Sequence, residues 1–143
     1  MPDLSLDEAV ELHHEAGDRI VRGDCEGYAA LYSRQDDVTL GNPFGPFARG
    51  YDNLLGTLQA AAASYRDGEA TRVERICEYV TDDLACFVEV EHYRAKVGGR
   101  SDASSVSVRV TSVFRSEQGG WKLVHRHADP ITAARPAESV IEA

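Results

Sequence analysis

The chain has 143 residues, of which 43% are hydrophobic and 27% are charged, and its formal net charge at pH 7 is −9. This length suits one domain, and the composition is that of a folded protein rather than a disordered one. The negative charge argues against binding to nucleic acid and against docking on anionic membranes, because both need a positive protein surface. We expect a single domain over residues 1–143, with its core over about 5–130 and a C-terminal tail over 131–143.

The cellular compartment is predicted from what the sequence lacks. Residues 1–15 are acidic and have no basic start followed by an apolar stretch, and no apolar run approaches the ~20 residues of a membrane-spanning helix. Cys25, Cys77 and Cys86 are odd in number and show no C-x-x-C spacing, which fits a reducing environment. We therefore expect a cytoplasmic protein without a cofactor, whose cysteines fill the core.

The N-terminal half predicts three helices and one short strand. Residues 5–8, Ser-Leu-Asp-Glu, have the form of a capping box, and Gly23 can end the helix that this box starts. Two prolines and two glycines exclude regular structure over residues 41–47. The other expected elements are a helix capped by Asp24 that includes Tyr28, Leu31 and Tyr32, a strand from Asp37 to Leu40, and a helix from about Tyr51 to Tyr65.

The C-terminal half predicts four long strands joined by short turns. Their expected bounds are Ala70 to Val80, Leu84 to Val97, Ser104 to Arg115 and Trp121 to Pro130. Three short connections make an antiparallel meander. Helices followed by strands indicate an α+β fold in which the helices pack on one face of the sheet.

The alternation of residue types indicates which face of the sheet is buried. Over residues 106–112 the apolar and polar positions alternate, so one face is expected to be buried. Over residues 87–93 both faces are partly apolar, which suggests that helices cover one face and a partner covers the other. The outer face is expected to carry Val88, Val90, Val113, Trp121 and Leu123. A patch of this kind is uncommon on monomers, so we expect a homodimer through the outer sheet face.

Three stretches of the chain, in this order, resemble a known family. They are Gly23-Asp24 with Leu31-Tyr32, then Asn42-Pro43-Phe44-Gly45 with Arg49-Gly50, and then the strands 109–115 and 120–129. The chain resembles the SnoaL-like, ketosteroid isomerase-like branch of the nuclear transport factor 2 superfamily. The resemblance implies a cone-shaped, cystatin-like α+β fold with three N-terminal helices on a curved, mostly antiparallel sheet. It does not give the function, because this scaffold carries many.

The catalytic residues of ketosteroid isomerases have no counterpart at the matching positions. The family's proton-shuttling aspartate corresponds here to Asn42, and an amide cannot accept a proton near neutral pH. The two oxyanion-stabilising positions correspond to Ala16 and, by a looser alignment, Val110. The resemblance therefore implies the fold without the isomerase activity.

A related association domain of calcium/calmodulin-dependent kinases indicates which side chains face the cone. Its pocket arginines correspond to Glu91, Ser112 and Ala128. The residues implied on the pocket side are Phe87, Glu89, Glu91, Tyr93, Val106, Val108, Val110, Ser112, Val124, Arg126 and Ala128. Those implied on the outer side are Trp121, His125, His127, Arg109 and Thr111. A bulge in a strand would reverse this assignment locally.

Glu89 and Glu91 are the candidate catalytic residues, together with Arg126. The two carboxylates lie on one face of a strand, about 6–7 Å apart at the rise of an extended chain. In an apolar cavity one of them is expected to keep its proton, with a raised pKa, and to act as general acid or base. The alternatives are that either glutamate forms an ion pair with Arg126 or is solvated at the mouth of the cavity.

Five further residues are candidates for ligand contacts: Asn42, Phe44, Tyr93, Ser112 and His127. Asn42 can donate to a ligand carbonyl or cap the turn before Pro43. His125 and His127, with Asp129 nearby, can bind a metal or form an acid/base pair, but a structural role is favoured and no metal site is expected. His13 and His14 lie on an acidic helix and are expected to be solvated.

Two functions of different classes remain open. One is a cofactor-independent enzyme that acts on a small apolar metabolite by proton transfer, as isomerases, cyclases or hydrolases do. The other is a non-catalytic module that binds a small ligand or mediates dimerisation. A carboxylate in the cavity that touches no arginine would favour the enzyme, and fully ion-paired carboxylates would favour the module.

Overall fold

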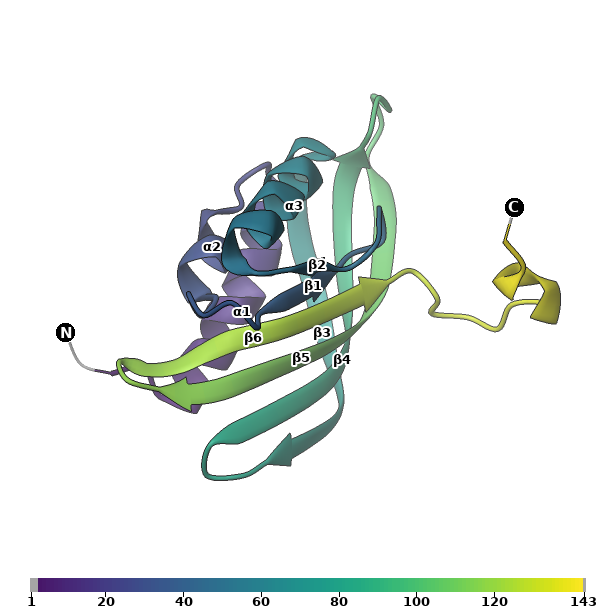
Figure 1. The fold of residues 1–143 in the computed structure, drawn as a ribbon. Helices are drawn as coiled ribbons and strands as arrows, with labels where there is room; N and C mark the ends of the chain where they lie inside the picture. Colours follow the sequence, from purple (N-terminus) through teal and green to yellow (C-terminus); the bar gives the residue numbers. More distant parts are fainter. Residues whose placement is uncertain (1–2, 143) are drawn as a thin grey trace.

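Three helices pack against the concave face of one curved sheet in the computed structural model, which describes residues 3–142 (Figure 1). The helices are α1 (Leu6–Ile20), α2 (Glu26–Leu31) and α3 (Tyr51–Ala63). This arrangement confirms the predicted α+β, cone-shaped fold. No helix in the described part of the chain is long and apolar enough to cross a membrane.

The sheet has six strands in the order β2-β1-β6-β5-β4-β3. The strands are β1 (Thr39–Gly41), β2 (Ala48–Arg49), β3 (Tyr65–Val80), β4 (Leu84–Val97), β5 (Ser104–Glu117) and β6 (Gly120–Asp129). Strands β3 to β6 form the predicted antiparallel meander. The sequence did not predict that β1 joins it by parallel pairing with β6, or that Ala48 and Arg49 pair back onto β1.

The predicted capping box starts α1. The Ser5 hydroxyl accepts from the Glu8 backbone N–H at 3.1 Å, and the Glu8 carboxylate accepts from the Ser5 N–H at 3.0 Å. The buried face of α1 consists of Ala9, His13, Ala16 and Gly17. This face points into the cone, so the helix contributes a histidine to the interior rather than to the solvent.

The third helix is shorter and the following strand longer than the sequence indicates. The helix α3 ends at Ala63, and β3 already begins at Tyr65, which pairs with Val97. The residues Arg66-Asp67-Gly68 that follow it form a bulge within β3. Gly68 donates its N–H to the Val21 carbonyl at 3.0 Å, and a Cβ on Gly68 would lie 2.6 Å from that oxygen. The absence of a side chain therefore lets β3 pass close to the end of α1.

A bulge in β6 corrects the predicted outer face. Val113 pairs with His125 whereas Phe114 pairs with Leu123, so Val124 is an extra residue. Between the start of β6 and this bulge, each side chain points to the face opposite to the one that unbroken alternation predicts, as expected for one inserted residue. Leu123 is fully buried in the main core beside Phe114, and Trp121 packs partly buried against the same core. The prediction that Trp121 and Leu123 lie on the outer face is wrong.

Beyond β6 the chain leaves the body of the fold. Residues 130–142 extend away from the sheet and include a short 3-10 turn over Ala137–Val140 (Figure 1). The apolar side chains of this segment are exposed, with Val140 at 86% and Ile141 at 70%. The cone and its interior are therefore built entirely from residues that precede this tail.

Candidate ligand-binding site

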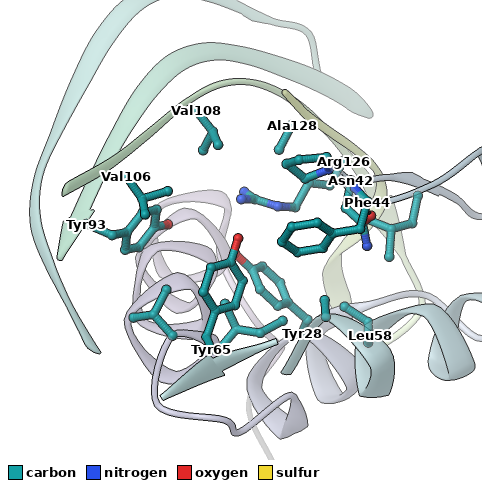
Figure 2. Close-up of a pocket in the computed structure, with 15 residues that line it drawn as sticks. Tyr28, Asn42, Phe44, Leu58, Tyr65, Tyr93, Val106, Val108, Arg126 and Ala128 are labelled. Atoms are coloured by element: carbon teal, nitrogen blue, oxygen red, sulfur yellow. Dashed lines mark hydrogen bonds between the residues drawn. The ribbon is translucent and has the colours of Figure 1, made fainter. Parts of the chain in front are cut away.

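The interior of the cone contains a pocket between the helices and the concave face of the sheet (Figure 2). Its walls are mostly apolar. The apolar lining residues are Ile20, Val21, Leu40, Pro43, Phe44, Leu58, Ala61, Val106, Val108 and Ala128, and the polar ones are Tyr28, Asn42, Tyr65, Tyr93 and Arg126. The open space is only about 50 Å³.

The polar groups gather on one side of this pocket. In Figure 2 the side chains of Tyr28, Tyr65 and Tyr93 direct their hydroxyl ends toward the Arg126 guanidinium group. Burial raises the pKa of Tyr28 and of Tyr65, so both keep their protons near neutral pH. The pocket therefore combines apolar walls with a cluster of hydrogen-bond donors.

The hydroxyl groups of Tyr28 and Tyr93 both lie close to Gly17 of α1. The Tyr93 hydroxyl donates to the Glu91 carboxylate. The Tyr28 hydroxyl is buried, and it has no hydrogen-bond partner of good geometry within residues 3–142. Tyr93 is near enough to lower the pKa of Tyr28, yet the distance and angle between the two hydroxyl groups do not give a hydrogen bond. Tyr28 thus presents an unused buried donor to the pocket.

Arg126 and Glu91 form a buried ion pair beneath the tyrosines. The guanidinium donates to both carboxylate oxygens, at 2.8 and 2.9 Å, and also to Nε2 of His13 at 3.0 Å. Burial alone would raise the pKa of Glu91, but the charge and hydrogen bonds of Arg126 outweigh it and the pKa falls to about 2. Burial, helped by the Arg126 charge, lowers the pKa of His13 to about 3. Glu91 is therefore ionised and His13 neutral near pH 7.

The Glu89 carboxylate is also buried and ion-paired, but its partners differ from those of Glu91. Its carboxylate accepts from Arg75 Nε at 2.7 Å and is 2.8 Å from His14 Nε2. Burial works to raise the pKa of Glu89, but the contacts with His14 and Arg75 together lower it. The expectation that Glu89 or Glu91 has a raised pKa is therefore wrong, because each carboxylate contacts a guanidinium group.

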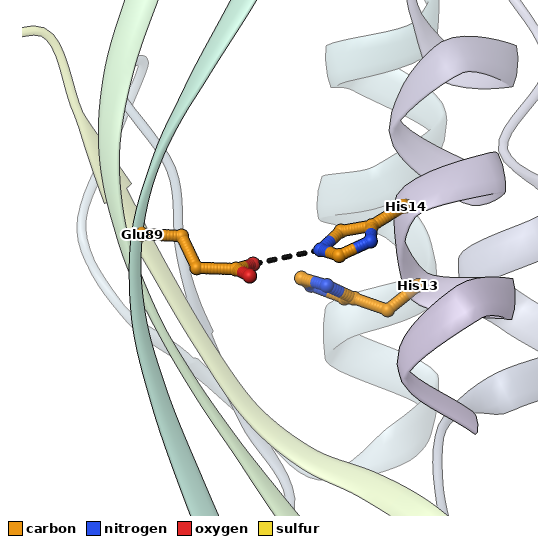
Figure 3. Close-up of side chains that lie close together, drawn as sticks. All are labelled: His13, His14 and Glu89. Atoms are coloured by element: carbon orange, nitrogen blue, oxygen red, sulfur yellow. Dashed lines mark hydrogen bonds and ion pairs between the residues drawn. The ribbon is translucent and has the colours of Figure 1, made fainter. Parts of the chain in front are cut away.

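The side chains of His13, His14 and Glu89 converge between α1 and β4 (Figure 3). Their candidate ligand atoms lie within 4.8 Å of one another, a grouping that can hold a metal ion. Two guanidinium groups already contact this cluster: Arg75 donates a hydrogen bond to Glu89, and Arg126 donates one to His13. A cation would meet both positive charges, so we assign this cluster to a hydrogen-bonded charge network.

The structure separates the ligand-contact candidates into two groups. Asn42, Phe44, Tyr93 and Arg126 line the pocket. The catalytic candidates Glu89 and Glu91 are buried outside its lining, and so is Ser112 on β5. His127 lies against the Phe47 ring, with centroids 5.5 Å apart, and does not line the pocket. A pocket role for Ser112 or His127 has no support in this geometry.

Asn42 caps the turn before Pro43 and also lines the pocket. Its Oδ1 accepts from the Phe44 N–H at 3.0 Å. The same turn presents the Phe44 ring to the pocket, where its centroid lies 5.6 Å from that of Tyr65. The loop over residues 41–47 therefore forms one wall of the site.

The sequence did not indicate that Tyr28 lines the pocket, and the expectation that His13 and His14 are solvated is wrong. His13 is only 1% exposed, and His14 bonds to a buried carboxylate. The spacing of Ala9, His13 and Ala16 along α1 is that of one helix face, which was the available signal for burying His13. No comparable signal exists for Tyr28, since a buried tyrosine on α2 looks like ordinary core.

The fold agrees with the comparisons to known proteins. Residues 9–132 match the SnoaL-like domain family, and the chain belongs to that family. No curated protein matches the sequence.

Several solved structures share the fold. One is a candidate dehydratase of the NTF2-like family from Streptomyces avermitilis, with 23% identity, a TM-score of 0.71, and coverage of 90% of this chain and 95% of that one. Another is an NTF2-like superfamily protein from Salmonella enterica, with 14% identity, a TM-score of 0.73 and 92% coverage of both chains. A ketosteroid isomerase-like protein from Erwinia carotovora has 18% identity, a TM-score of 0.69, and coverage of 90% and 95%. At these identities the likeness is one of fold.

Proposed function

We propose that this SnoaL-like protein binds one small, largely apolar molecule in its cone and does not catalyse proton transfer. The observation that carries the proposal is the charge state of the pocket. Arg126 is the one charged side chain among the lining residues of the described chain, and Glu91 neutralises it through two hydrogen bonds. What remains for a ligand is an apolar surface with a few uncharged donors, which is the usual character of a small-molecule site.

The enzymatic alternative finds no free base among the described residues that line the pocket. A general base needs a carboxylate or imidazole within hydrogen-bond reach of the substrate and a pKa near the working pH. Glu89 and Glu91 are ion-paired with lowered pKa values, and His13 is neutral but bonded to Arg126 behind the pocket. The criterion stated for the two hypotheses, whether the carboxylates touch an arginine, thus supports the binding module.

Methyl NMR tests binding inside the cone directly. Titration with a series from benzene to naphthalene should shift the methyl signals of Leu40, Leu58, Val106 and Val108, which line the pocket. The methyl signals of Val88 and Val90 on the outer face should stay in place. If no molecule of the series produces a saturable shift of the pocket methyls, the proposal is wrong.

A pair of variants on α3 provides the control. Ala61 is buried and lines the pocket, whereas Ala60 on the same helix is exposed. Ala61→Leu should fill part of the site and weaken binding, and Ala60→Leu should leave it unchanged. Equal binding by both variants would place the ligand elsewhere.

We also infer a homodimer through the outer sheet face. Val88 and Val90 remain on this face after the correction for the β6 bulge, whereas Val113 packs partly buried against the main core. The distal end of the β3–β4 hairpin adds Tyr79, which pairs with Cys86, and Leu84, which lies two residues before Cys86 on the same face; their exposed fractions are 61% and 47%. Exposed apolar side chains gathered in one region favour a protein partner.

A further inference from the structure

The size of the pocket limits what it can hold while Phe44 is in place. Its open space of about 50 Å³ is smaller than the ~150 Å³ of an apolar cavity that binds benzene. A six-membered ring therefore does not fit without some movement of the walls. Any ring-sized ligand has to displace a side chain of comparable size.

Phe44 is the side chain best placed to move. It projects from its loop toward the tyrosines of the pocket (Figure 2), yet 51% of it is exposed. Its neighbour Gly45 has open space around it, with no atom within 4 Å of the position that a Cβ would take. Rotation of the Phe44 side chain toward solvent would vacate the volume of one phenyl ring next to Tyr65.

The free polar group of the pocket is a donor. The Tyr28 hydroxyl is buried and has no hydrogen-bond partner among residues 3–142, and burial favours its protonated form. An unsatisfied buried hydroxyl is costly, and a ligand oxygen that accepts its hydrogen bond removes that cost. The ligand is thereby expected to carry an acceptor oxygen close to Tyr28.

The surrounding charges favour an uncharged acceptor. Glu91 already takes two hydrogen bonds from Arg126, so the positive charge of the guanidinium is compensated. A carboxylate on the ligand would bring a second negative charge into the same buried region, where charges without a partner are strongly disfavoured. A carbonyl oxygen meets the donor without adding charge.

We infer that the ligand is an uncharged, single-ring molecule whose carbonyl oxygen accepts a hydrogen bond from Tyr28 while its ring takes the place of Phe44. This inference rests on the proposed function and adds the ligand class to it. Three probes of nearly equal shape separate its parts. Acetophenone has the ring and the carbonyl, α-methylstyrene replaces the oxygen by a methylene group, and benzoate carries a negative charge.

The dissociation constants of the three probes are measured by methyl NMR on the full chain. Acetophenone should bind about tenfold more tightly than α-methylstyrene, as one buried hydrogen bond predicts, and benzoate should bind most weakly. Tyr28→Phe should remove the preference for acetophenone and leave the affinity for α-methylstyrene unchanged. Tyr51→Phe is the matched control, because the Tyr51 hydroxyl donates to the Ala29 carbonyl at 2.7 Å outside the pocket lining.

The role of Phe44 is tested with a larger probe. Phe44→Ala should bind acetophenone more tightly than the wild type and should also admit 2-acetonaphthone, which the wild type excludes. Equal affinity for acetophenone and α-methylstyrene, or a preference that survives in Tyr28→Phe, overturns the assigned ligand class. If naphthalene shifts the pocket methyls but no single-ring probe does, the inference fails while the proposed function stands. If no apolar molecule binds, both fail.

Discussion

The guanidinium group of Arg126 holds the carboxylate of Glu91 by two hydrogen bonds, at 2.8 and 2.9 Å, where both side chains are buried. A buried pair of this kind is stable only when both partners are present, because either charge alone would lie unpaired in a poorly solvated environment. The pair links β4 to β6 across the inner face of the sheet, and it supports the tyrosines above it.

Glu91→Gln should therefore destabilise the fold strongly. The variant leaves the Arg126 guanidinium without its counter-charge, and removing one partner of a buried pair costs about 3–5 kcal/mol. Urea unfolding at pH 7 measures the loss. Glu89→Gln is the matched control, and its loss should be smaller because Arg75 and His14 are partly exposed and can turn to solvent. A Glu91→Gln variant as stable as the wild type would contradict the ion pair.

Stability should fall in acid in two steps. The folded-state pKa of His13 is about 3 against a usual 6.5, so the unfolded chain takes up a proton first and stability is lost as pH falls below about 6.5. The pKa of Glu91 is about 2 against 4.5, so a second loss begins below about 4.5. One such group contributes a slope of about 1.4 kcal/mol per pH unit.

His13→Gln isolates the first step. The amide oxygen of glutamine can accept from Arg126 as the imidazole does, but it does not titrate. Unfolding free energies at pH 7, 5.5 and 4.5 should show a shallower slope for this variant than for the wild type. Parallel pH profiles for the two proteins would mean that His13 is not the group that titrates.

Tyr28 and Tyr32 are expected to respond oppositely to removal of their hydroxyls. Both are 1% exposed, but Tyr32 donates to the Thr39 carbonyl at 2.9 Å whereas Tyr28 has no partner within the described chain. Tyr28→Phe should raise the free energy of unfolding by about 1 kcal/mol, and Tyr32→Phe should lower it by a similar amount. Thermal or urea unfolding of the two variants provides the comparison. A loss of stability in Tyr28→Phe equal to that in Tyr32→Phe would reveal a partner for the Tyr28 hydroxyl.

The parts of the fold that the sequence predicts are those with local signals. The capping box at Ser5 and the alternation over residues 106–112 each depend on neighbouring residues, and the structure bears both out. The extra residue Val124 has no such signal, because the residue pattern of an apolar strand does not differ with or without a bulge. One inserted residue was enough to place Leu123 on the wrong face.

The state of the glutamates was not predictable from β4 alone. The alternation correctly places Glu89 and Glu91 on the inner face, where both are buried. The alternative of an ion pair with Arg126 is the state found for Glu91. The partners of Glu89, which are Arg75 on β3 and His14 on α1, have no signal in the sequence. Burial was expected to raise one of these pKa values, but the contacts with guanidinium groups and His14 outweigh it.

Gly17 is expected to tolerate no side chain, although it lies within a helix. Alanine is favoured over glycine in helices by about 1 kcal/mol, so Gly17→Ala would ordinarily stabilise the protein. Here an added Cβ would collide with the Tyr93 hydroxyl and lie 3.2 Å from that of Tyr28. The Tyr93 hydroxyl is fixed by its bond to Glu91, so we expect a net loss of about 1–3 kcal/mol in unfolding experiments.

A second substitution tests the cause of that loss. Tyr93→Phe removes the oxygen that the new methyl group would strike. In the Gly17→Ala/Tyr93→Phe double variant, the alanine should therefore cost much less than it does in the wild-type background. Strictly additive losses would show that the two residues do not interact.

The last prediction concerns the oligomeric state. Sedimentation at micromolar concentration should give twice the chain mass of 15.6 kDa, because the outer face carries Val88 and Val90 and is continuous with the apolar end of the β3–β4 hairpin. Val88→Glu places a charge in this face and should produce a monomer that remains folded. Leu12→Glu is the control, since Leu12 is exposed on α1, away from the sheet. A wild-type protein that sediments as a monomer, or a Val88→Glu variant that stays dimeric, would rule out this interface.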